Sequence, residues 1–152
     1  MLRTRRFKFA AIALIAVARL YSGGFWLQMG TVEASAEAKA RNAVLVVRAT
    51  GCHDPATAKV SGFAIRMVDG RKETTQLKLI AMQQPGTFAV MRDWPEDASV
   101  TLEFVGHEPG MSTSMLVKAR GSSVEKASAK FYPHEPTPQE EQAAMDLKSV
   151  GQ

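Results

Sequence analysis

Short strand-like runs separated by turn signals constrain the fold of this 152-residue chain more than any other feature. The runs are spaced at roughly a dozen residues and are rich in valine, leucine and threonine, as antiparallel strands are. Asp69-Gly70 between two alternating runs is the strongest hairpin signal, and further turns fall at Pro-Gly pairs. This spacing leaves no room for alternating strand and helix units. The strands are expected over residues 43–49, 59–68, 74–82, 87–93, 99–105, 111–119 and 124–131.

Two of these runs indicate how the strands are buried. Residues 43–49 (AVLVVRA) are almost continuously apolar, which is typical of a strand covered on both faces. Residues 99–105 place Val100, Leu102 and Phe104 on one face and polar residues on the other, the pattern of a strand with one buried face. The sequence therefore predicts an all-β domain over residues 43–131, a seven-stranded antiparallel immunoglobulin-like β-sandwich.

The first 36 residues have the composition of an export leader. Residues 1–8 are basic, residues 9–18 are apolar, and Ala34-Ser35-Ala36 is a small-residue cleavage signature. We expect residues 1–36 to be a signal peptide. The alternative is a retained N-terminal membrane anchor, in which residues 20–29 extend the apolar run to about 20 residues. The protein is accordingly expected in the periplasm or outside the cell, or anchored to the inner membrane.

The C-terminal segment, residues 132–152, changes character. Residues 132–138 hold three prolines and are expected to form an extended linker. Thr137, Pro138 and Glu140 then form a capping-box start, which predicts a short helix over residues 139–148. A helix of this length is marginal in water, so it either docks through Ala144, Met145 and Leu147 or frays.

The charge of the chain argues against nucleic acid as a partner. The formal net charge of +4 comes from the leader, because from residue 37 onward fourteen basic residues are balanced by fourteen acidic ones. The basic residues of the leader are Arg3, Arg5, Arg6, Lys8 and Arg19.

Cysteine, histidine and methionine side chains offer one candidate metal site. Cys52 is the only cysteine, so it cannot form an intramolecular disulfide, and it lies beside His53 in an expected loop. His107 and Met111 flank the turn at Pro109-Gly110. Thiolate, imidazole and thioether groups suit copper, so Cys52, His53, His107 and Met111 are candidate copper ligands if the loops converge. The alternative is a buried Cys52, an intermolecular disulfide, and methionines that fill the core.

No enzyme motif is present in the sequence. It lacks a phosphate-binding loop, a dinucleotide fingerprint, a paired-cysteine zinc site and a nucleophile elbow, so we expect a protein that is not an enzyme. Trp94 has two interpretations, because a tryptophan at a strand end either fills the core or anchors a partner at the rim.

Residues 84–105 (QPGTFAVMRDWPEDASVTLEFV) resemble small exported bacterial immunoglobulin-like sandwich domains of the YtkA or transthyretin-like kind. In that kind of domain a Pro-Gly turn starts a strand and a Gly-Trp pair starts the next, whereas this chain has Asp97-Ala98 at the second place. The resemblance implies the fold and export, and a link to copper in some relatives. We expect a non-enzymatic module that binds a cell-envelope component, with a periplasmic copper-binding protein as the alternative.

Overall fold

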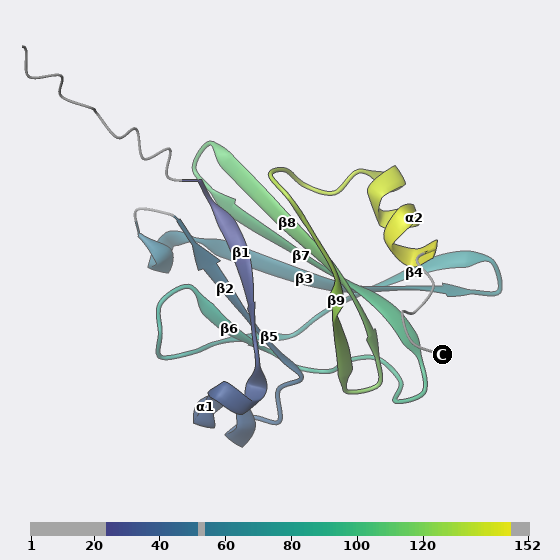
Figure 1. Ribbon diagram of the computed structural model, residues 1–152, viewed down its shortest axis with the longest axis horizontal. Helices are drawn as coiled ribbons and strands as arrows, with labels where there is room; N and C mark the ends of the chain where they lie inside the picture. Colours follow the sequence, from purple (N-terminus) through teal and green to yellow (C-terminus); the bar gives the residue numbers. More distant parts are fainter. Residues whose placement is uncertain (1–23, 52–53, 147–152) are drawn as a thin grey trace, which may run out of the picture.

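The computed structural model describes residues 24–51 and 54–146, which fold mainly into two antiparallel sheets (Figure 1). The four-stranded sheet has the order β1 (Trp26–Gly30), β2 (Leu45–Thr50), β6 (Thr87–Val90) and β5 (Leu79–Ala81). The five-stranded sheet has the order β4 (Arg71–Gln76), β3 (Lys59–Val68), β7 (Ser99–Glu108), β8 (Met111–Arg120) and β9 (Ser123–Tyr132). The remaining elements are η1 (Val32–Ala34), α1 (Ala36–Ala40), η2 (Pro55–Thr57) and α2 (Pro138–Asp146).

The all-β architecture with a short C-terminal helix is confirmed, but the expected number of seven strands is wrong. The described residues form nine strands, and one of the two extra strands arises where the expected run 74–82 divides. Its first part pairs with β3 in one sheet and its last part with β6 in the other. Leu77 lies at the crossover, buried, with its amide donating to the carbonyl of Gly62 at 2.8 Å. Because both parts are extended, alternation of side chains does not reveal the change of sheet.

The other extra strand, β1, comes from the segment expected to belong to the leader. It pairs antiparallel with β2, and Phe25 and Leu27 are buried in the main core. Gly106 of β7 permits this packing, since a Cβ there would lie 3.0 Å from the Phe25 ring and 3.1 Å from Leu27. The folded domain therefore begins well before residue 43. Residues 1–23, which include the basic and apolar runs of the expected leader, lie outside the described residues.

The main core lies between the two sheets, as the alternation in residues 99–105 predicts. Val100, Leu102 and Phe104 of β7 are all buried there. The predicted exposure of the opposite face of β7 is wrong, because Thr101 on that face is only 3% exposed. Across the core from β7, β2 contributes alternate residues, and the predicted burial of β2 on both faces is confirmed. Its intervening residue Val46 lies in a second, smaller cluster with Ala38 of α1. One short helix thus covers part of the outer face of the four-stranded sheet.

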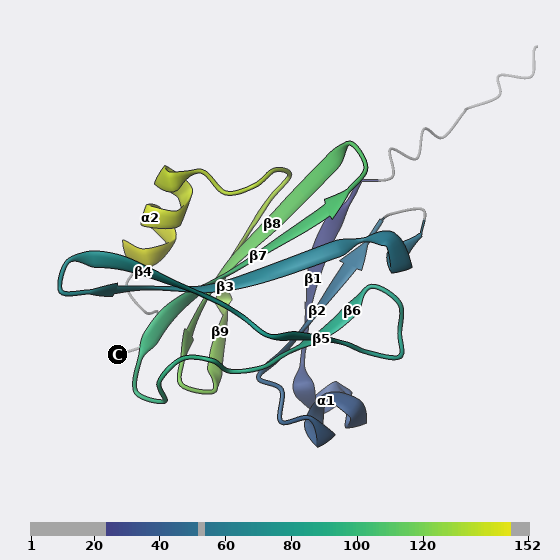
Figure 2. The ribbon, with the colours of Figure 1, turned by 180° about the vertical axis from the view of Figure 1, so that it is seen from behind.

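Helix α2 covers the outer face of the five-stranded sheet near β7 and β8 (Figure 2). Its start is the expected capping box: the Thr137 amide donates to Glu140 Oε2 at 2.8 Å, and the Glu140 amide donates to Thr137 Oγ1 at 3.3 Å. Of the two alternatives, docking and fraying, the structure shows docking: Ala144 is buried, and the Lys118 ammonium donates to the carbonyl of Met145 at 3.3 Å. Leu147 lies outside the described residues. None of the helices within residues 24–51 and 54–146 has the length and apolar character to cross a membrane.

Truncation of two buried residues, Phe25 just before β1 and Leu27 within it, should destabilise the protein strongly. We expect Phe25→Ala to lower the free energy of unfolding by about 3–5 kcal/mol and Leu27→Ala by about 2–5 kcal/mol, through lost burial and a cavity. Gln28→Ala, an exposed position on the same strand, should change it by less than about 0.5 kcal/mol. Urea unfolding of the full-length variants measures all three. Equal effects at Phe25 and Gln28 would show that β1 does not belong to the folded core.

Stability should also depend on the ionisation of Glu103, a half-buried residue of β7. Burial raises the pKa of this carboxyl group above its ordinary value of 4.5, and the neighbouring carboxylates of Glu141 and Glu135 raise it further, whereas Lys72 opposes the rise. The folded state therefore holds the proton more tightly than the unfolded state. The stabilising contribution of Glu103 is complete below pH 4.5 and is lost as the pH rises through the folded-state pKa.

We therefore expect Glu103→Gln to raise the urea midpoint at neutral pH, by an amount that shrinks as the pH falls toward 4.5. Urea titrations of both proteins across this pH range make the comparison. Glu33→Gln, at an exposed position of η1, controls for the loss of one negative charge. A constant difference between Glu103→Gln and the unsubstituted protein at every pH would contradict the assignment.

Candidate functional site

The structure describes two of the four candidate copper ligands. His107 and Met111 lie on either side of the β7–β8 turn, both exposed, and His107 Nε2 is 3.6 Å from Glu135 Oε1. Cys52 and His53 lie outside the described residues. His107 pairs in register with Lys59, so the start of β3 lies at the same end of the domain as this turn. Within residues 24–51 and 54–146 no group of three His, Cys, Asp or Glu side chains is placed to hold a metal ion, and the copper site stays a prediction.

The candidate partner-binding residue Trp94 occupies the core. Its side chain is only 6% exposed, and its indole Nε1 donates to the carbonyl of Gly121 at 2.9 Å. The ring thus fills the core, which is the first of the two interpretations of Trp94. A partner-binding role for Trp94 stays a prediction that this buried position does not favour.

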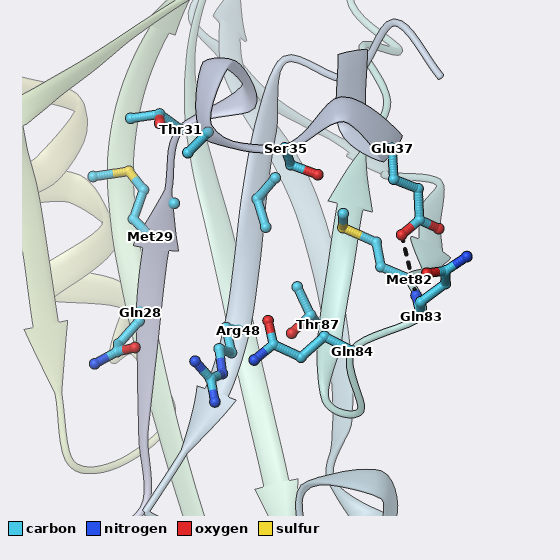
Figure 3. A pocket seen from close by; sticks show the side chains of 13 residues that line it. Gln28, Met29, Thr31, Ser35, Glu37, Arg48, Met82, Gln83, Gln84 and Thr87 are labelled. Atoms are coloured by element: carbon cyan, nitrogen blue, oxygen red, sulfur yellow. Dashed lines mark hydrogen bonds between the residues drawn. The ribbon is translucent and has the colours of Figure 1, made fainter. Parts of the chain in front are cut away.

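A pocket of about 480 Å³ lies on the outer face of the four-stranded sheet (Figure 3). Its floor follows the strand register: Gln28 of β1 pairs with Arg48 of β2, and Arg48 pairs with Thr87 of β6. These three residues form one row across neighbouring strands, and their side chains share a face of the sheet. The next row along the same face holds Val46 and Ala89, which are covered by α1. The pocket begins where that cover ends.

The walls of the pocket come from α1 and from the loop between β5 and β6. Ser35 caps α1 by accepting a hydrogen bond from the Ala38 amide at 3.1 Å. Glu37 of α1 holds the loop in place, because its Oε2 accepts from the Gln83 amide at 3.2 Å. Its other oxygen pairs with Arg41 at 3.0 Å. Both oxygens of this carboxylate are therefore engaged by the protein itself.

Two polar atoms in the pocket lining are buried without a hydrogen-bond partner: Nε of Arg48 and Oγ1 of Thr87. Thr87 is only 5% exposed. The terminal nitrogens of Arg48 have one neutral neighbour, Gln84, whose amide oxygen, when turned toward the guanidinium, accepts from Nη2 at 3.2 Å and from Nη1 at 3.3 Å. No carboxylate of the described residues forms an ion pair with Arg48. Buried groups of this kind normally have partners, so the pocket has hydrogen-bonding capacity that the fold does not use.

Sequence reasoning missed this pocket entirely. Its polar residues come from positions 28, 48, 84 and 87, and only the strand register brings them together. One signal was available in the sequence. Arg48 is the single charged residue in the apolar run 43–49, and a charge inside a strand that is buried on both faces requires either a partner or a site.

The comparisons with known proteins identify no relative of this chain. No family model, no curated protein and no solved structure matches the chain. The function must be inferred from the chemistry of the pocket.

The unpartnered hydroxyl of Thr87 predicts an unusual response to substitution. Thr87→Val keeps the shape and removes a buried group without a partner, so we expect stability to be unchanged or raised by up to about 1 kcal/mol. Thr113 is the matched control, since it is 3% exposed but its hydroxyl donates to the carbonyl of Tyr132 at 3.0 Å. Thr113→Val should cost about 1 kcal/mol. Thermal and urea unfolding compare the two variants, and equal losses would mean that Thr87 has a partner in solution.

Proposed function

We propose that this protein is an exported, non-enzymatic binding module of the cell envelope, and that the pocket around Arg48 is its binding site. The observation that carries the proposal is a guanidinium without an ionic partner in the described residues, at the floor of a concave site. The floor is built on three hydrogen-bonded strands, so its groups are held in place before a ligand arrives. Preorganised groups of this kind favour binding because they lose little conformational entropy when the ligand binds.

The chemistry of the lining supports binding rather than catalysis. Arg48 contributes a guanidinium group, and Gln28 and Thr87 contribute an amide and a hydroxyl group. Such groups recognise a ligand through charge and hydrogen bonds. The one carboxylate in the lining, Glu37, already accepts from Arg41 and from the Gln83 amide, so it is poorly placed to move a proton.

The export part of the proposal rests on the sequence of residues 1–18, with its basic start and apolar run. Because β1 belongs to the folded domain, we propose that any cleavage falls before Gly24 rather than after Ala36. A retained inner-membrane anchor is compatible with the same folded domain. The immunoglobulin-like, YtkA-like classification belongs to this proposal too, and two antiparallel sheets that enclose one core support it.

Site-specific photo-crosslinking in the host cell tests the proposal. A benzoylphenylalanine at Gln83, on the exposed rim of the pocket, should give an adduct with an envelope component after irradiation. We expect Arg48→Gln to reduce the yield of that adduct about tenfold, as loss of a charged hydrogen-bonding anchor implies. Cell fractionation of the same samples reports whether the chain reaches the envelope.

The matched control carries the photoreactive residue at Thr74, an exposed position of β4 in the other sheet. It should give no specific adduct. Urea unfolding of Arg48→Gln shows whether the variant remains folded. The proposal fails if Gln83 gives no adduct, if Thr74 gives the same adduct, or if a folded Arg48→Gln variant crosslinks as well as the unsubstituted protein.

A further inference from the structure

We infer that the pocket around Arg48 binds a carboxylate group attached to a short apolar body. The inference rests on the proposed binding function and specifies the ligand of the same site. Two chemical sources share this character: a free short-chain carboxylic acid, and the C-terminal carboxylate of a polypeptide that ends in an apolar residue. Both present two oxygens in the geometry that a guanidinium recognises.

The charges around the pocket favour an anion. Only two charged side chains line it, Arg48 and Glu37. Glu37 is paired with Arg41 at 3.0 Å and lies at the far side of the pocket from Arg48 (Figure 3). The charge left without a counter-ion is therefore the positive charge of Arg48. A ligand carboxylate would supply the missing partner in a site that is partly shielded from water.

Gln84 already shows where the ligand oxygen would lie. When its amide is turned so that the oxygen faces the guanidinium, that oxygen accepts from both terminal nitrogens of Arg48, at 3.2 and 3.3 Å, in the place where a carboxylate oxygen would be held. A carboxylate forms shorter and stronger hydrogen bonds to a guanidinium than a neutral amide does, so it can displace this side chain. Gln84 is an exposed residue of the loop between β5 and β6, so its displacement leaves no buried amide without a partner.

The rest of the lining limits what the carboxylate is attached to. Val46 and Met82 line the pocket and belong to the apolar cluster under α1, so the ligand needs an apolar portion next to its charged end. The volume of about 480 Å³ lies within the range of small-molecule sites. A large polyanion or a bare inorganic anion would leave this apolar wall uncovered.

The test uses the full-length protein and five soluble probes, four organic molecules and sulfate as the inorganic control, followed through the Nε–H signal of Arg48 in ¹⁵N-resolved NMR spectra. N-acetylleucine represents the C-terminal source and butyrate the free acid. N-acetylleucinamide and butyramide are their uncharged counterparts. We expect the acids to shift the Arg48 signal and the backbone amide signals of Gln28 and Thr87, and the amides to leave all three unchanged. The acid that binds more tightly identifies the source.

Four variants separate the roles of the individual groups. Arg48→Lys keeps the charge but loses the planar pair of donors, and should weaken binding of the tighter acid about tenfold. Gln84→Glu places an internal carboxylate on Arg48 and should weaken binding by at least about tenfold, because it competes with the ligand. Gln84→Ala removes the internal acceptor and should bind at least as tightly as the unsubstituted protein. Thr74→Ala, on the exposed face of β4, should change nothing.

Several results would overturn the carboxylate inference. These are no shift with either acid, equal shifts with acids and amides, a response to sulfate as large as that to N-acetylleucine, or Gln84→Glu binding as well as Gln84→Ala. This failure can be told apart from failure of the proposed function. If the Gln83 crosslink persists and depends on Arg48 while no acid binds, the binding module stands and the ligand chemistry is different.

Discussion

Strand β2 has two apolar faces, and the rest of the structure is arranged around the need to cover both. Its inward residues pack between the sheets, and Val46 on the outer face needs a separate cover. The chain provides that cover by leaving β1 through η1 and folding back as α1 before it enters β2. Val46 is thus covered by Ala38, a residue close to it in the sequence. The order of β1, α1 and β2 follows from this requirement.

The same requirement explains why a pocket exists beside α1. A helix of five residues is only about 7.5 Å long, so it covers the row that contains Val46 and not the next row. The next row contains Arg48, whose guanidinium cannot be covered without an acceptor. The loop of β5 and β6 approaches from the other side and offers only the amide of Gln84. The short helix α1 and the charged residue Arg48 in the uncovered row together produce a recess with hydrogen-bond donors that the protein does not use.

Local signals in the sequence predicted much of the fold. Asp69-Gly70 marked the β3–β4 hairpin correctly, and both residues adopt the positive φ angles, 50° and 75°, that this turn requires. Thr137 and Glu140 predicted the start of α2 because a capping box involves only neighbouring residues. The division of residues 74–82 between two sheets could not be predicted, because it is determined by the packing of Leu77 rather than by a local preference. The pocket could not be predicted either, because only the strand register brings its residues together. In the sequence, the charge of Arg48 within an apolar run was the single indication of it.

The segment before residue 36 shows how one apolar sequence can support different interpretations. Residues 24–30 are apolar enough to extend a leader, yet Phe25 and Leu27 pack between the sheets against Gly106. The same segment supplies part of the pocket floor through Gln28. Removal of the chain up to Ala36 would therefore take away an edge strand, open the core at Gly106 and leave Arg48 at the side of an incomplete recess. If the chain is exported as we propose, the position of leader cleavage determines whether the proposed binding site is complete.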